Sequence, residues 1–104
     1  MGILGTLFGT GKKTEKIKEM MANGAIIIDV RSPSEFKGGH IAGSQNIPLQ
    51  QIEDKAAKIK KTGKPIIACC ASGMRSAQAT GILSSKGIEV FNGGAWSSLQ
   101  SKLD

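Results

Sequence analysis

Two short runs of consecutive apolar residues constrain the fold of this chain more than any other feature. Residues 25–30 and 65–69 are rich in isoleucine and show no alternation of polar and apolar side chains. Strands that face water on one side alternate, whereas strands covered on both faces do not. Segments with helical spacing of apolar residues separate the two runs. Strands that alternate with helices predict an α/β three-layer sandwich, a parallel sheet with helices on both faces.

The remaining predicted elements are shorter or more polar. We predict helices over residues 14–23, 32–37, 49–61, 76–86 and 95–103, and strands over 44–47 and 88–91, with a turn at 92–94. Residues 1–13 are glycine-rich, and we expect them to form a flexible or lightly docked N-terminal segment. Residues 14–104 then form one domain.

The composition narrows the classes of partner. The 104 residues carry a net charge of +6, mostly from lysine, but only 4% are aromatic and none of these is interleaved with the lysines. This pattern indicates a solvated basic face that attracts small anions, and we expect no nucleic-acid partner. The apolar residues 1–10 are too short to span a membrane, so we expect no membrane association. Two adjacent cysteines suit the reducing cytoplasm and lack metal-ligand spacing, so no metal or cofactor is expected.

Residues 65–76 join the second apolar run to a small loop and then to a helix. The loop comprises Cys70, Ala71, Ser72, Gly73, Met74, Arg75 and Ser76. Backbone N–H groups and the N-terminus of a helix surround such a cysteine with positive partial charge, which favours the thiolate near neutral pH. Ser72 and Ser76 can donate hydrogen bonds to this ring or cap the following helix. Cys70 is therefore predicted to be a nucleophile.

Several motifs occur in an order and spacing that are typical of one family. They are Ile28-Asp29-Val30-Arg31, Glu35-Phe36, Gly39-His40-Ile41 with Gly43, Asn46-Ile47-Pro48, the 70–76 loop, and Gly93-Gly94 followed by Trp96. From about residue 14 onward the chain resembles the single-domain rhodanese family of sulfurtransferases. The resemblance implies a rhodanese-like sandwich, usually with a further edge strand. Residues 1–13 are poorly suited to supply that strand, so we expect four to five strands.

The resemblance implies a thiosulfate sulfurtransferase. The Cys70 thiolate would attack a small anionic sulfur donor such as thiosulfate, and the resulting persulfide would pass its sulfur to cyanide or a thiol. The thiol would belong to a small molecule or to a protein such as a thioredoxin-like reductant, and the enzyme would be a monomer. Backbone N–H groups of residues 71–75 would hold the persulfide, and Arg75 would fork onto the oxygens of the donor.

Two other classes of function stay open. Counted from Cys70, the loop is a Cys-x4-Arg ring suited to a sulfur atom. Counted from Cys69, it is the longer Cys-x5-Arg ring of cysteine phosphatases and some arsenate reductases, which hold an oxyanion. Adjacent strand residues face opposite sides, so only one cysteine can face the ring, and Gly73 favours Cys70. The other class is non-catalytic: a sulfur carrier, an interaction module or a redox sensor.

Five residues are expected to support the site or to pack beside it. Asp29 and Arg31 would form an ion pair or hydrogen bonds that fix loops, and His40 would anchor a loop through a hydrogen bond. Trp96 is expected to pack in the core or at the rim of the site. Cys69 is expected to be a small buried apolar side chain, with a resolving thiol as the alternative.

Overall fold

The structure, a computed structural model, describes the backbone of residues 2–103 and the side chains of residues 11–103. Its elements are α1 (Gly2–Ala22), β1 (Ile26–Asp29), α2 (Pro33–Lys37), β2 (Gln45–Asn46), the 3-10 turn η1 (Leu49–Gln51), α3 (Ile52–Lys61), β3 (Ile66–Cys70), α4 (Met74–Ser85), β4 (Val90–Ala95) and α5 (Trp96–Leu103). Four strands form one parallel sheet in the order β2-β1-β3-β4. The predicted α/β class and parallel sheet are confirmed.

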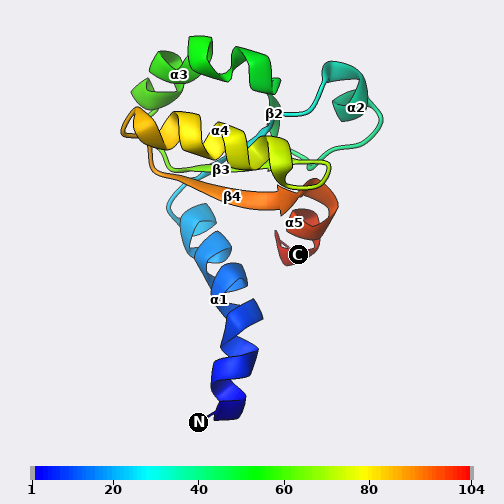
Figure 1. The fold of residues 1–104 in the computed structure, drawn as a ribbon, viewed down its shortest axis with the longest axis vertical. Coiled ribbons are helices and arrows are strands. Elements are labelled where there is room, and N and C mark those ends of the chain that lie inside the picture. The colour runs from blue at the N-terminus through cyan, green and yellow to red at the C-terminus, as the bar shows by residue number, and fades with distance from the viewer. Residues whose placement is uncertain (1, 104) are drawn as a thin grey trace.

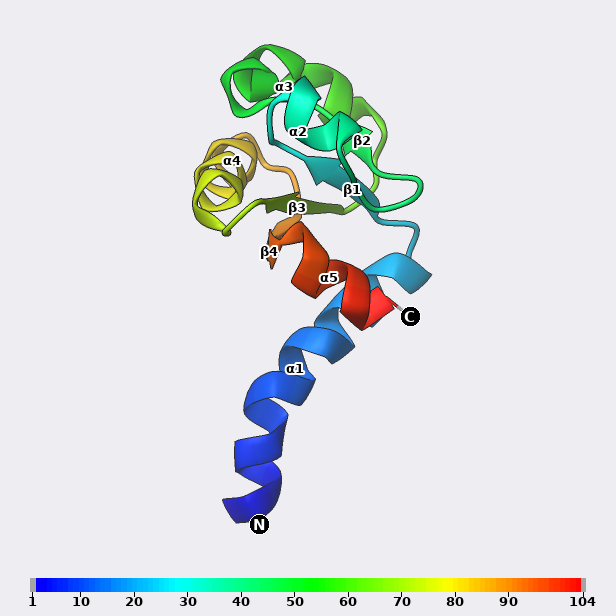
Figure 2. The same cartoon turned by 90° about the vertical axis from the view of Figure 1, so that its right-hand side faces the viewer.

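Helices cover both faces of the sheet, with α3 and α4 on one side and α1 and α5 on the other (Figures 1 and 2). Successive residues of the central strands face different layers. Ile28 and Ile66 pack in the core under α3 and α4, whereas Ile27 and Ile67 pack in the core against α1 and α5. This explains why the two central strands lack alternation: each has a buried face on both sides.

The helix α1 begins 12 residues earlier than the sequence predicts. The prediction starts a helix at Thr14, whereas α1 starts at Gly2. Each glycine disfavours a helix by roughly 1 kcal/mol relative to alanine, so the glycine-rich start weakened the helical signal. Met1 lies outside the described residues, as do the side chains of residues 2–10. Within residues 2–103 no helix combines the length and the hydropathy that are needed to cross a bilayer.

The last strand also differs from the prediction. Asn92-Gly93-Gly94, predicted as a turn, lies inside β4, and the register between β3 and β4 shifts at this point. A Cβ atom on Gly93 would lie 2.9 Å from the Ile67 side chain, so glycine is needed here for the close approach of two strands. The glycine pair therefore lets β4 continue to Ala95, which pairs with Cys70.

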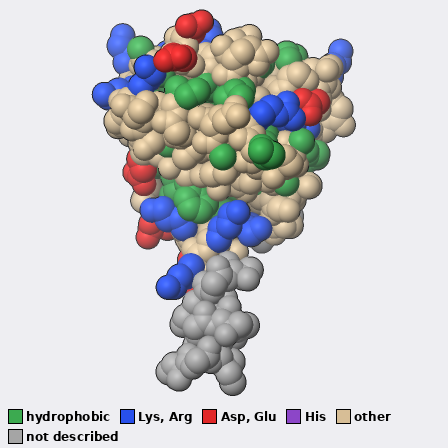
Figure 3. Space-filling model, viewed as in Figure 1, with side chains coloured by type: hydrophobic (Ala, Val, Ile, Leu, Met, Phe, Trp, Pro, Cys, Tyr) green, Lys and Arg blue, Asp and Glu red, His purple; other side chains and the backbone are tan. Residues whose placement is uncertain are grey.

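The lysine side chains are dispersed on the face drawn in Figure 3. Basic groups there are separated by neutral atoms and by acidic side chains, and they do not merge into one patch. On this face the positive charge is therefore spread over the surface and not concentrated at one place.

Candidate active site

Cys70 is the last residue of β3, and its side chain faces the layer formed by α3 and α4. The following loop turns sharply into α4 at Gly73, which precedes the helix with a φ of 99°. Only glycine adopts this left-handed conformation without strain. A Cβ atom at this position would also lie 3.4 Å from the Cα of Gly94 in β4. The backbone therefore bends over the sulfur of Cys70.

Backbone N–H groups of this loop point at the sulfur atom. The N–H of Gly73 donates to the Cys70 Sγ at 3.0 Å, and the N–H of Ser76 donates to it at 3.3 Å. Burial raises the pKa of Cys70, but the hydrogen bond between its sulfur and the Ser76 side chain, together with those from the backbone of Ser76, Gly73 and Ser72, outweighs it. The net pKa lies below that of an ordinary thiol, in the direction that the sequence predicts.

The two N–H donors come from different elements. Gly73 belongs to the loop that is predicted to hold a persulfide, whereas Ser76 lies one residue beyond that range, in the first turn of α4. The N-terminal turn of a helix has free N–H groups, and after the bend at Gly73 that of Ser76 reaches the Cys70 sulfur.

Ser76 connects the sulfur to the neighbouring strand. Its Oγ lies 3.4 Å from the Cys70 Sγ and donates to the Oδ1 of Asn92 at 2.6 Å. The side chain of Asn92 also donates to the carbonyl of Gly73 and accepts from the N–H of Gly94. Asn92 therefore fixes both the hydroxyl and the bend of the loop to β4. Asn92 lies where the register between β3 and β4 shifts.

Cys69 faces the opposite side of the sheet. It packs in the core that α1 and α5 cover, whereas Cys70 belongs to the core under α3 and α4. The prediction that the two cysteines face opposite ways is confirmed. Burial, and then the charge of Asp29, raise the pKa of Cys69 to about 12. Cys69 therefore does not face the loop, and the interpretation of a ring counted from Cys69 is wrong for this structure.

Arg75 is held by a carboxylate of the same chain. Its Nη1 and Nη2 donate to the two oxygens of Glu35 at 2.8 and 3.0 Å. Hydrogen bonds from Arg75, and then from the backbone of Ser32, lower the pKa of Glu35 to about 2. The sequence prediction aimed this guanidinium at a donor molecule, but in the structure it forks onto Glu35. The fork fastens the Cys70 loop to α2.

Asp29 and Arg31 form a buried ion pair at the end of β1. The Nε and Nη2 of Arg31 donate to the carboxylate of Asp29 at 2.7–3.0 Å. Arg31 also donates to the backbone carbonyls of Glu35 and Gly39. The pair therefore holds the segment that carries Glu35, as the structural role predicted for it requires. Buried ion pairs of this kind are strongly destabilised when one partner is removed.

His40 and Trp96 make local contacts. The Nδ1 of His40 lies 2.7 Å from the carbonyl oxygen of Phe36, and the two rings stack at 3.7 Å. This is the loop-anchoring hydrogen bond that the sequence predicts. Trp96 packs against the core of α1 and α5, and its ring lies 4.9 Å from the guanidinium carbon of Arg31. Among residues 11–103, no hydrogen bond joins either side chain to Cys70.

The comparison with known families decides what kind of domain this is. The family model described as "Rhodanese-like domain" matches residues 13–98. The chain belongs to the rhodanese-like domain family. The match begins at Lys13 and includes every candidate site residue described above.

Individual relatives agree with this assignment. The chain is 30% identical over 79 residues to the thiosulfate sulfurtransferase GlpE of Ectopseudomonas mendocina, covering 75% of this chain and 72% of that protein. It is 44% identical over 69 residues to the uncharacterized protein YqhL of Bacillus subtilis, covering 65% of this chain but only 54% of the relative. The chain therefore spans about half the length of this second relative.

A crystal structure gives the same picture. A rhodanese-related protein from Thermoplasma volcanium superposes with a TM-score of 0.68 at 33% identity, covering 85% of this chain and 88% of the other. The rhodanese-like fold thus extends over most of both chains. Four strands, and not five, make up the sheet within the described residues of our rhodanese-like domain.

Two residues that hold the Cys70 loop and the start of α4 in place were missing from the predicted site. Glu35 belongs to a family motif, but the sequence gives no sign that it reaches Arg75, 40 positions later in the chain. Asn92 was assigned to a turn. The available signal was a polar residue directly before a glycine pair at the end of a predicted strand. Since β4 pairs with β3, and β3 ends at Cys70, a residue in this position lies near the Cys70 loop.

Cys70 has no solvent-accessible surface in this conformation. Its sulfur accepts from the N–H groups of Gly73 and of Ser76, so the loop and the first turn of α4 lie against it.

Proposed function

We propose that this rhodanese-like domain is a thiosulfate sulfurtransferase that works through a Cys70 persulfide. The observation that carries the proposal is the pair of backbone N–H groups, from Gly73 and Ser76, that point at one sulfur atom. Two such donors stabilise a thiolate, and they would stabilise a persulfide anion in the same way. The resemblance to proteins named thiosulfate sulfurtransferase supports the same chemistry.

The first step needs no outside oxidant or proton donor. The Cys70 thiolate supplies an electron pair to the outer sulfur of thiosulfate, and a new S–S bond forms. The S–S bond of thiosulfate breaks, and sulfite leaves with its electron pair. In the second step cyanide or a thiolate attacks the outer sulfur of the persulfide. Cys70 then leaves as the thiolate, ready for another cycle.

Loop opening is part of this proposed cycle. Because Cys70 has no accessible surface in this conformation, we propose that residues around the sulfur move to admit the donor, while the bend at Gly73 keeps its N–H directed at the sulfur. The fork between Arg75 and Glu35 is part-exposed, so an anionic donor would compete with Glu35 for the guanidinium. The acceptor would be a small thiol or a protein such as a thioredoxin-like reductant. We place the reaction in the cytoplasm, where both free cysteines stay reduced.

Mass spectrometry of the intact protein tests the proposal. Thiosulfate should add one sulfur atom, peptide mapping should locate it on Cys70, and cyanide should remove it as thiocyanate. An unmodified mass under these conditions would count against the enzyme. Turnover of an aryl phosphate without sulfur transfer would instead support oxyanion chemistry. Sulfur uptake only from a persulfide, without thiosulfate turnover, would indicate a sulfur carrier.

A further inference from the structure

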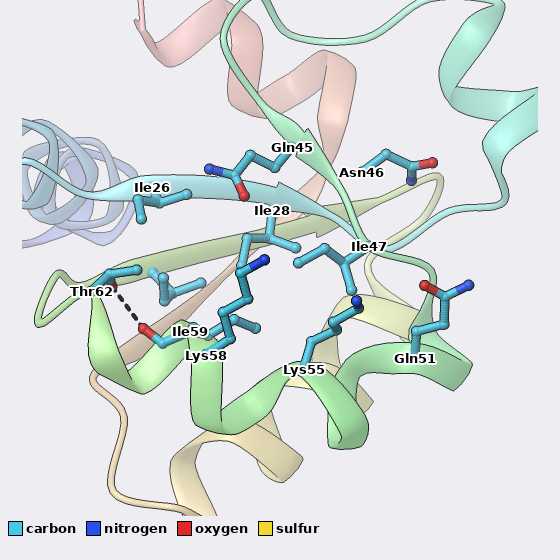
Figure 4. A pocket seen from close by; sticks show the side chains of 11 residues that line it. Ile26, Ile28, Gln45, Asn46, Ile47, Gln51, Lys55, Lys58, Ile59 and Thr62 are labelled. Carbon is cyan, nitrogen blue, oxygen red and sulfur yellow. Dashed lines mark hydrogen bonds between the residues drawn. The ribbon is translucent and has the colours of Figure 1, made fainter.

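A second site lies on the far side of the sheet from α5, away from the Cys70 loop. A cavity of about 490 Å³ opens between α3 and the edge formed by β1 and β2 (Figure 4). Its floor consists of Ile26, Ile28 and Ile66 from the sheet, and Ile47 and Ile59 form its walls. A cavity of this volume is within the range of small-molecule sites.

The short edge strand explains why the cavity exists. β2 has only two residues, and they pair with Ile28 and Asp29. Ile26, at the start of β1, pairs with Ile66 on its inner side but has no strand partner on its outer side among the described residues. The C-terminal half of α3 extends past the end of β2. The apolar surface that stays open there belongs mainly to Ile26 and Ile47, which are half-buried, whereas Ile28, Ile59 and Ile66 are buried beneath it.

Two lysines border this apolar cavity. Lys55 and Lys58 lie on the same side of α3 as Ile59 and Thr62, at the i, i+3, i+4 and i+7 positions of one helical face. In Figure 4 both side chains rise from α3 alongside Ile28 and Ile47. Within the described residues neither ammonium has an ion-pair or hydrogen-bond partner, and no acidic residue lines the cavity.

We propose that this cavity binds a small organic anion with an apolar body, of the class of medium-chain carboxylates. The hydrocarbon chain would cover Ile26 and Ile47, and the carboxylate would lie between the ammonium groups of Lys55 and Lys58. Charge complementarity selects this occupant, since two cations without an ion-pair partner among the described residues border an apolar cavity that no carboxylate lines. The neutral amides of Gln45 and Gln51, also at the cavity, add hydrogen-bond donors without adding negative charge.

The two parts of such a ligand contribute separately. Each methylene that is buried on the isoleucines strengthens binding by about fourfold. The carboxylate gains less, because both lysines are solvent-exposed and exposed ion pairs are weak. A short carboxylate such as butyrate and a neutral chain such as octanol should therefore both bind more weakly than octanoate.

Methyl and amide NMR titration of the intact 10.9 kDa chain tests the proposal. Octanoate should shift the signals of Ile26, Ile28 and Ile47 in a saturable manner and leave those of Cys70 and Gly73 unchanged. Butyrate should bind at least about tenfold more weakly, as expected if a few methylenes lose contact.

Charge variants locate the carboxylate. The double variant Lys55→Glu/Lys58→Glu should weaken octanoate binding by about tenfold or more, since two attractions become repulsions. The matched control Lys61→Glu/Lys64→Glu makes the same change in net charge on lysines that do not line this cavity. It should leave the affinity within about twofold of the wild type.

Three results would overturn the proposal: no saturable shifts with octanoate, equal weakening by both double variants, or octanol binding as tightly as octanoate. Persulfide formation on Cys70 is measured separately by mass and does not depend on this site. A negative result for one proposal would therefore not contradict the other.

Discussion

Cys69 and Cys70 are adjacent in one strand, and neither side chain is accessible to solvent, yet their surroundings are opposite in character. Cys69 lies among apolar side chains and near the carboxylate of Asp29, and its pKa is raised to about 12. Cys70 accepts hydrogen bonds from Gly73 and Ser76, and its pKa is lowered. One residue of separation in a strand is enough to place the two sulfurs on different faces.

The two cysteines show that burial by itself does not determine the direction in which the pKa of a thiol shifts. Desolvation raises the pKa of both thiols. The difference comes from the N–H groups that the left-handed bend at Gly73 and the start of α4 direct at one of them. In physical terms, the pKa is lowered where lost hydration is replaced by fixed hydrogen-bond donors.

Removing either sulfur gives the largest expected contrast. Cys70→Ser should abolish sulfur uptake from thiosulfate, because no nucleophile remains in the loop. Cys69→Ser should retain uptake within a few-fold, since its side chain only fills the opposite core. Intact mass after thiosulfate treatment measures both. Loss of uptake in Cys69→Ser, with a folded circular dichroism spectrum, would contradict the assignment of the two roles.

Gly73→Ala should remove most of the difference between the two cysteines. An alanine at a φ of 99° costs about 1–2 kcal/mol and moves the N–H that donates to Cys70. We expect the rate of persulfide formation to fall by about 10²–10³-fold, as for the loss of one donor in an anion-binding site. Stopped-flow release of sulfite measures this rate.

Gly81→Ala is the matched control for that substitution. Gly81 lies within α4, and a Cβ atom there would meet nothing within 4 Å. Alanine should stabilise the helix by about 1 kcal/mol and leave the rate unchanged. Equal rates in the two alanine variants would show that the conformation of Gly73 does not matter for the chemistry.

Ser76→Ala should produce a smaller change. The Ser76 hydroxyl, which donates to Asn92 beside the thiol, can turn to donate to the thiolate. Without this hydroxyl the pKa of Cys70 should rise and the rate at neutral pH should fall by about tenfold. The pH dependence of alkylation by iodoacetamide measures this shift, with the exposed Ser84→Ala as control. An unchanged pH profile in Ser76→Ala would mean that the backbone donors alone hold the thiolate.

Glu35→Gln should have the smallest effect at neutral pH, less than about tenfold on the rate, because the fork with Arg75 is part-exposed. The pH dependence of stability at acidic pH distinguishes this variant from the wild type. Since the pKa of Glu35 falls from 4.5 to about 2 on folding, its contribution to stability is complete above pH 4.5 and is lost as pH falls toward 2. Urea unfolding should therefore show a stability difference from wild type that shrinks over this range. A difference that is equal at pH 2 and pH 7 would exclude this charge effect.

The sequence predicts the central architecture well, for a physical reason. The non-alternating runs around Ile27 and Ile67 report burial on both faces, and that property alone requires helices on each side of the sheet. The surroundings of Cys70 were also predictable, because the end of a strand, a glycine bend and a helix start are all local features. Features of this kind depend on consecutive residues, so they can be predicted from the sequence.

The parts that could not be predicted depend on contacts between distant segments. Glu35 meets Arg75 only after α2 and α4 are packed. Glycine at position 93 is typical of a turn, and only the structure shows that the Ile67 side chain lies beside it. The closure over Cys70 depends likewise on how β4 holds the bend through Asn92. None of these distances follows from spacing along the chain.

The opposed orientation of the two cysteines has a consequence for oxidative damage. The chain has two cysteines in all, and their Cβ atoms point away from each other across the sheet, so they cannot close a disulfide without a rearrangement of β3. If peroxide converts Cys70 to a sulfenic acid, no thiol of the same molecule is placed to condense with it. Reduction of that sulfenic acid must then come from a thiol outside the chain.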